Sequence, residues 1–133
     1  MAKYLGIDYG SKRIGIALSD DNGLIAFPRS TLMNDQTLIP ILTELIQKQS
    51  VDVVVVGESK DKDGNDNPIM KKARRFALEL EQHVAVQIYF EPEYYSSVEA
   101  KKGATNSFVD AGAASIILNR YIERAKNNDF ITG

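Results

Sequence analysis

The sequence of 133 residues contains no cysteine, no tryptophan and a single histidine, His83. Without cysteine, a disulfide framework, a thiolate metal site and a cysteine nucleophile are all excluded. A Ser-His-Asp hydrolase is not supported either, because the G-x-S-x-G motif is missing. His83 stands at the start of an apolar segment and is interpreted as structural, so carboxylates become the first candidates for chemistry.

Long apolar runs and an excess of charge of one sign are also missing. No segment approaches the roughly 18 apolar residues of a membrane-spanning helix, and the N-terminus shows no signal-peptide pattern. The 16 basic and 18 acidic residues give a net charge of -2, which argues against a general polyanion-binding surface. We therefore expect a cytoplasmic protein without membrane contact, in which any contact with nucleic acid uses a local basic patch.

The composition is that of a folded protein. Apolar residues make up 44% and charged residues 26% of the chain, as in globular proteins and unlike disordered segments. A chain of 133 residues can bury one hydrophobic core but is short for two ordinary domains. We expect a single domain over residues 1–133.

The N-terminal part of the chain predicts three consecutive antiparallel strands. Two apolar runs, residues 4–8 and 14–18, flank a polar tip at residues 9–13, which is the pattern of a β-hairpin. A turn signal at residues 20–23 (DDNG) leads into an extended run over residues 24–31. Three such segments joined by short turns indicate an antiparallel meander.

The middle of the chain alternates between helical and strand patterns. Apolar residues at helical spacing predict helices over residues 37–50 and 68–80, and β-branched or alternating apolar residues predict strands over residues 51–57 and 84–90. An acidic loop is expected over residues 58–67.

The C-terminal part predicts two further helices. A capping-box spacing at Ser96 and Glu99 indicates a short helix that ends near Lys102, and the last helix starts around Phe108. Small residues between positions 111 and 114 would let this helix lie close against the sheet. Its expected apolar stripe consists of Val109, Ala113, Ile116 and Ile117.

The order of these elements predicts an α/β fold. Three antiparallel strands followed by helix-linked strands imply one mixed five-stranded sheet with helices on both faces. Ligands in such sheets gather at the strand ends.

Three acids lie at comparable places in this arrangement: Asp8 at the end of the first strand, Glu93 just past the last strand and Asp110 in the first turn of the last helix. Each has an ordinary explanation, namely a turn cap, a solvated loop acid and a carboxylate that favours the helix dipole. The alternative is one cluster of hard oxygen ligands gathered by the fold. Such a cluster suits Mg²⁺ or Mn²⁺, and two such ions can promote attack of water on a phosphodiester.

The opening motif resembles that of a known family. Residues 5–20, LGIDYGSKRIGIALSD, are similar to the N-terminal motif of the YqgF family, small RNase H-like proteins described as Holliday junction resolvases or pre-16S rRNA nucleases. Further segments match in order: residues 53–57 before an Asp-Gly loop at 63–64, SSVEA at 96–100 where the family has T-T-x-E-A, and residues 109–118. The resemblance covers nearly the whole chain, and the first motif is the most specific.

The resemblance implies an RNase H-like fold and a divalent-metal nuclease. Aligning SSVEA with the family segment places Glu93 on the family's glutamate. The implied catalytic residues and metal ligands are then Asp8, Glu93 and Asp110, with Mg²⁺ or Mn²⁺ as cofactor. The implied activity is endonucleolytic hydrolysis of structured nucleic acid, in the first place at the 5′ end of pre-16S rRNA, and alternatively of branched DNA at Holliday junctions.

Two departures from the family pattern leave alternatives open. Tyr94 stands where the family has an Arg that could hold a phosphate, and Gly57-Glu58-Ser59 stands where the family has G-L-P. Glu58 could therefore replace or supplement Glu93 as a metal ligand. The protein could also be a nucleic-acid-binding module of the same fold with weakened catalysis.

Two local basic pairs are the candidates for contact with nucleic acid. Lys12 and Arg13, at the hairpin tip, are the basic pair closest in sequence to Asp8, and Lys101 and Lys102 are expected near the other end of the site. An exposed hairpin tip without a binding role is the alternative. Symmetric cleavage of a four-way junction would favour a homodimer, whereas trimming an rRNA end needs only a monomer.

Overall fold

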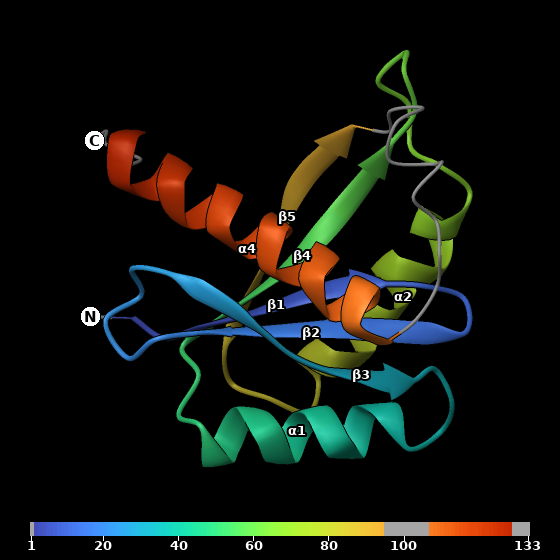
Figure 1. The fold of residues 1–133 in the computed structure, drawn as a ribbon. Coiled ribbons are helices and arrows are strands. Elements are labelled where there is room, and N and C mark those ends of the chain that lie inside the picture. Colours follow the sequence, from blue (N-terminus) through green and yellow to red (C-terminus); the bar gives the residue numbers. More distant parts are fainter. Residues whose placement is uncertain (1, 95–106, 129–133) are drawn as a thin grey trace.

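The structure is a computed structural model that describes residues 2–94 and 107–128, with the backbone alone for residues 94, 107–110 and 128. The short helix expected at residues 96–102 lies outside the described residues, as do Lys101 and Lys102. The described part of the chain forms one sheet with helices on both faces (Figure 1).

The sheet has five strands in the spatial order β3-β2-β1-β4-β5. The strands are β1 (Tyr4–Tyr9), β2 (Arg13–Ser19), β3 (Ala26–Met33), β4 (Val53–Lys60) and β5 (Gln87–Tyr94). Neighbouring strands among β1, β2 and β3 pair antiparallel, whereas β4 pairs parallel with both β1 and β5. The predicted mixed sheet, a meander followed by parallel strands, is confirmed.

The helices of the described residues divide between the two faces of the sheet. They are α1 (Leu38–Lys48), α2 (Ile69–Glu81) and α4 (Ser107–Asn128). α1 and α2 cover one face, and α4 crosses the other (Figure 1). Over residues 2–94 and 107–128, no helix combines the length and the apolarity required to cross a membrane.

Alternation along β1 determines which residues meet each helical layer. Leu5 and Ile7 are fully buried in the core with α1 and α2, whereas Gly6 faces α4. Because Gly6 has no side chain, α4 lies very close to the sheet: a Cβ at this position would be 2.8 Å from the Cβ of Leu118 and 3.0 Å from the carbonyl oxygen of Ala114. The close approach predicted for the N-terminal half of this helix is confirmed at Ala114.

The apolar stripe of α4 agrees only in part with the expected one. Ile117 is buried against the sheet as expected, together with Ala114 and Leu118, but Ile116 is 60% exposed. The side chain of Val109 lies outside the described side chains. The helix carries apolar residues on more than one side, so helical spacing alone allows several faces. The glycine on β1 selects the face that is buried.

The two parallel strands extend further than expected. Glu58, predicted to open a loop, continues β4 because β5 pairs beside it as far as Lys60 with Tyr94. β5 begins at Gln87, three positions later than predicted, and ends at Tyr94. Glu93 is therefore a strand residue, whose side chain points to one face of the sheet, and not a loop acid.

Gly6→Ala is expected to destabilise the protein, because the added methyl group would collide with the backbone of α4. We expect a loss of about 1–3 kcal/mol in the free energy of unfolding, measured by urea denaturation. Gly112→Ala is the matched control, since among the described residues no atom beyond the helix's own backbone lies within 4 Å of a Cβ there, and it should raise stability by up to about 1 kcal/mol. Equal losses in the two variants would contradict the close packing at Gly6.

Candidate active site

Asp8 lies near the carboxyl end of β1, the central strand, on the face of the sheet that α4 covers. Its antiparallel partner on β2 is Gly15. On β4, the pairing of Ile7 with Val56 places Gly57 at the next position, beside Asp8. Neither neighbouring strand therefore adds a side chain next to this half-buried carboxylate.

Glu93 on β5 extends towards the same place. It shares the α4 face with Glu91, which pairs in register with Gly57. A Cβ on Gly57 would lie 2.9 Å from Oε1 of Glu93 and 2.7 Å from Cδ1 of Ile117. The carboxylate of Glu93 thus lies over Gly57, in the direction of the strand that carries Asp8. The fold brings these two predicted acids to the same glycine.

α4 directs its first turn towards the same end of the sheet. Tyr121 packs its ring against Tyr4 at the start of β1, with centroids 5.8 Å apart, and Ala114 lies over Gly6. The helix therefore runs opposite to β1, and its N-terminal turn points towards the carboxyl end of that strand. Asp110 belongs to this turn by its backbone, and its side chain lies outside the described side chains.

Glu58 lies on the opposite face of the sheet. Its side chain points towards α2, where Nη2 of Arg74 donates to Oε2 of Glu58 at 2.7 Å and Nζ of Lys60 lies 3.7 Å from Oε1. Asp66 joins this network, and the hydrogen bonds from Lys60 and then Arg74 hold the pKa of Asp66 below its usual value. The structure does not bring Glu58 together with the acids on the α4 face, so its placement does not support it as a ligand with them.

Glu91 is an acid of the site region that the sequence analysis missed. It is only 3% exposed, and its Oε1 accepts a hydrogen bond from Nη2 of Arg124 on α4. The available signal was the continuation of strand alternation beyond residue 90. The partner is 33 residues away in the sequence, so spacing cannot reveal it.

The hairpin tip between β1 and β2 is held in a defined shape. A Cβ on Gly10 would lie 2.5 Å from the carbonyl oxygen of Arg13, so a side chain does not fit there. Asn34 donates from Nδ2 to the carbonyl of Gly10 at 2.8 Å and from its backbone N to that of Lys12 at 3.0 Å. Lys12 is exposed, and Arg13 is half-buried on the α4 face. These residues stand at the end of the sheet that carries Asp8.

Two acids on this face have the donor chemistry that a divalent cation prefers. Asp8 and Glu93 supply hard oxygen donors, which Mg²⁺ and Mn²⁺ prefer, and Gly57, which has no side chain, leaves room for the Glu93 carboxylate over it. In the stretches whose side chains are described, residues 2–93 and 111–127, no three acids or histidines form a group that could hold a metal ion. Asp110, the third implied ligand, lies outside those stretches.

The sheet order and the helix packed across the central strands define an RNase H-like fold. RuvC of Thermus thermophilus in complex with a Holliday junction substrate is similar with a TM-score of 0.61 and 14% identity, covering 96% of each chain. The Holliday junction resolvase of fowlpox virus has a TM-score of 0.50 and 14% identity, covering 91% of this chain and 98% of that one. Identities this low show the fold alone, and they confirm the predicted fold class.

The chain belongs to the RuvX family, whose sequence model is described as a Holliday junction resolvase and matches residues 2–124. A relative from Nitratidesulfovibrio vulgaris is 33% identical over 125 residues, which cover 92% of this chain and 84% of that protein. A relative from Lawsonia intracellularis is 35% identical over 136 residues, covering 94% and 96%. Both carry the name "Putative pre-16S rRNA nuclease". The resemblance drawn from the opening motif is confirmed.

Gly57→Ala tests the space over the glycine. The new methyl group would press on the ends of two flexible side chains, Glu93 and Ile117, so we expect a loss of stability below about 1.5 kcal/mol. Displacement of the Glu93 carboxylate should weaken Mn²⁺ binding about tenfold or more, measured by titration calorimetry on the protein alone. Gly112→Ala is again the control. Unchanged Mn²⁺ affinity in Gly57→Ala would show that this space is not part of a metal site.

Proposed function

We propose that this protein is a divalent-metal-dependent endonuclease that hydrolyses phosphodiester bonds in structured nucleic acid, with the 5′ end of pre-16S rRNA as its principal substrate. The observation that carries the proposal is the position of the Glu93 carboxylate over Gly57, next to the strand position of Asp8. Membership of the RuvX family and relatives named as pre-16S rRNA nucleases support it.

Asp8, Glu93 and Asp110 would hold Mg²⁺ or Mn²⁺ in this proposal. When bound, such ions stabilise the charge on phosphoryl oxygens and make water a better nucleophile. Asp8 is oriented by the central strand, which is paired on both sides. Glu93 reaches in from β5, and Ile117 borders the space above Gly57 in which its carboxylate lies. Asp8 and Glu93 are therefore supplied by strands of one sheet, which fixes their separation.

The hairpin tip supplies the proposed contact with the nucleic acid backbone. Lys12 and Arg13 would neutralise phosphates at the end of the sheet that carries Asp8. Lys101 and Lys102 are proposed for the same role from the segment outside the described residues. Trimming of an rRNA end needs only a monomer, and a role in ribosome maturation would place the protein in the cytoplasm.

Two other functions are favoured by specific observations. The description of the RuvX family as a Holliday junction resolvase favours branched DNA as the substrate, and symmetric cleavage would then call for a homodimer. Tyr94, in place of the Arg of the family pattern, favours a binding module with weakened catalysis. All three functions would use the same face of the sheet, so they are distinguished by cleavage and binding assays with different nucleic acid substrates.

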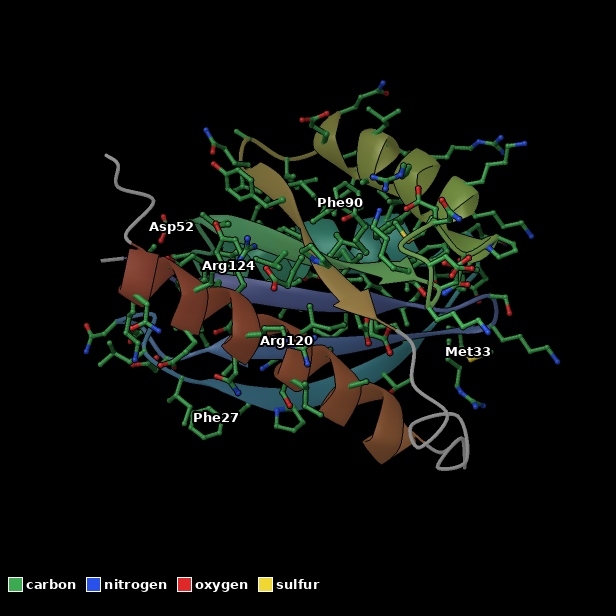
Figure 2. All side chains as sticks on the ribbon, turned by 90° about the horizontal axis from the view of Figure 1, so that it is seen from above. Phe27, Met33, Asp52, Phe90, Arg120 and Arg124 are labelled. Atoms are coloured by element: carbon green, nitrogen blue, oxygen red, sulfur yellow. The ribbon has the colours of Figure 1, made fainter. Side chains whose placement is uncertain are left out.

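Asp8→Asn should abolish Mg²⁺- or Mn²⁺-dependent cleavage while the melting temperature stays near or above that of the parent, because the substitution removes a repulsive acid. Cleavage would be measured on pre-16S rRNA 5′ fragments, single strands and four-way DNA junctions. Asp52→Asn is the matched control. Asp52 is exposed, lies just before β4 at the other end of the sheet (Figure 2), and accepts the backbone N–H of Lys3, which asparagine can also do.

A parent protein that cleaves none of these substrates with either ion would rule out the enzyme. Retained binding without cleavage would then identify the binding module. Cleavage of the four-way junction, but not of the rRNA fragment, would establish the resolvase instead.

Lys12→Gln is expected to make RNA binding less dependent on salt, because one phosphate contact is lost. The slope of log K against log salt concentration should become shallower by about 0.7–0.9, measured by fluorescence anisotropy over a salt series. Lys48→Gln is the control, since Lys48 lies at the end of α1 and pairs with Glu44 at 3.1 Å. Equal slopes for Lys12→Gln and the parent would place the hairpin tip outside the interface.

A further inference from the structure

A groove of about 790 Å³ lies between α1 and α2, on the other face of the sheet from Asp8. These two helices cover that face together (Figure 1). The size of the groove is that of a ligand pocket. Its lining includes two aromatic side chains, Tyr9 of β1 and Phe76 of α2, together with basic, acidic and amide groups. The proposed function does not use this groove.

Tyr9 connects the groove with the candidate active site. Asp8 and Tyr9 are consecutive residues of β1, so their side chains point to opposite faces of the sheet. Tyr9 is half-buried, and its ring centroid lies 5.0 Å from that of Phe76. Asn34, which also lines the groove, donates from Nδ2 to the carbonyl of Gly10 at 2.8 Å. The groove therefore lies beside the hairpin tip, residues 10–12, at the end of the sheet that we call the hairpin end.

Two basic residues of α2 line the groove at the hairpin end. β4 runs parallel to β1, and the backbone N of Asn67 bonds to the carbonyl of Ser59, so α2 begins at this end of the sheet. Lys72 and Arg75 precede Phe76 on α2 and therefore lie near the tip.

The charges of Lys72 and Arg75 are not neutralised by an ion pair. Both side chains are exposed, and among the side chains that the structure describes neither forms a salt bridge. Arg74, between them in the sequence, differs because it pairs with Glu58 at 2.7 Å and with Asp66 at 3.0 Å. Lys72 and Arg75 therefore present positive charge to solvent along the groove.

The acids that line the groove are engaged in other contacts or lie further from the tip. Asp35 accepts the backbone N–H of Thr37 at 2.9 Å and its hydroxyl at 2.5 Å, in the turn before α1. Glu44 forms a salt bridge with Lys48 at 3.1 Å. Glu79 lies a turn further along α2, away from the tip. The hairpin end of the groove thus combines two unpaired cations with an aromatic pair.

We propose that the hairpin end of the groove binds a single-stranded extension of the nucleic acid substrate. Lys72 and Arg75 contact its phosphates, and Tyr9 stacks against one of its bases. Cations that follow the backbone and aromatic rings that stack on bases are the two elements of single-strand recognition. The inference rests on the proposed nucleic acid substrate and narrows it to structured nucleic acid with a single-stranded extension beside the scissile bond.

The position of Tyr9 gives the extension a role in specificity. Because Tyr9 follows Asp8 on one strand, the separation of the two residues is fixed. A strand that passes round the hairpin tip, where Lys12 is exposed, meets both faces of the sheet. An extension anchored at Tyr9 therefore presents to Asp8 a bond at a defined distance from the anchor, and such positioning raises the rate of a reaction.

Fluorescence anisotropy in EDTA tests binding separately from cleavage. The probes are one RNA stem-loop without an extension and the same stem-loop with a single-stranded 5′ extension of about ten nucleotides. The parent should bind the extended RNA about tenfold more tightly than the blunt RNA. On the extended RNA, the slope of log K against log salt concentration should become shallower by about 0.7 in Lys72→Gln and about 1.4 in the double variant with Arg75→Gln. Binding of the blunt RNA should stay unchanged.

Lys71→Gln is the matched control for Lys72→Gln, because Lys71 is exposed beside it on α2 but does not line the groove. Tyr9→Leu should weaken binding of the extended RNA about fivefold or more, whereas Tyr9→Phe, which keeps the ring, should bind as the parent does. If Tyr9→Leu does not fold, the variants of Lys72 and Arg75 decide, since these side chains are exposed.

Equal affinity of the parent for the two RNAs would overturn the inference, and so would equal slopes in Lys72→Gln and Lys71→Gln. Oligoglutamate that displaces the extended RNA as well as single-stranded RNA of the same charge does would identify an acidic peptide as the ligand and overturn it too. A parent that binds neither RNA would overturn the proposed function as well. Loss of cleavage with retained preference for the extended RNA would overturn the nuclease and support the groove.

Discussion

The close packing of α4 against the glycines of two central strands is the constraint on which this structure depends. A Cβ on Gly6 would collide with the backbone of α4, and one on Gly57 would collide with Ile117. The helix can therefore approach the sheet this closely only at strand positions that carry no side chain. Its direction over β1 then aims its first turn at the carboxyl end of that strand, where Asp8 is located.

Strand alternation separates the acids near the strand ends into groups with different surroundings. Glu58 faces α2 and pairs with Arg74, and Glu91 faces α4 and pairs with Arg124. The carboxylate of Glu93 lies over the glycine of β4, next to the strand position of Asp8. The chain belongs to a family described as Holliday junction resolvases, and the proposed chemistry on a phosphodiester is assigned to the face with Asp8 and Glu93.

Much of the fold could be predicted from residue patterns, because hairpins and amphipathic helices depend on neighbours in the sequence. The hairpin around residues 9–13, the meander and the parallel strand after residue 50 are all present. The residue patterns gave wrong predictions where a residue distant in the sequence determines the local structure. Glu58 continues a strand because β5 lies beside it, and Ile116 is exposed because the glycine of β1 selects another face of α4. Of the acids on the α4 face, Glu93 was a candidate from its place after the last predicted strand and from the family resemblance, whereas Glu91 was not among the candidates.

The sequence by itself determined the family, the α/β class and the presence of an acid at the end of the first strand, since these follow from a contiguous motif and from local periodicity. Only the tertiary structure decided which acids approach each other. Alternation sends Glu58 and Gly57 to opposite faces, and the register of β5 sets Glu91 and Glu93 around that glycine. The physical reason is that strand register and helix packing join residues far apart in the chain, and no local pattern encodes such distances.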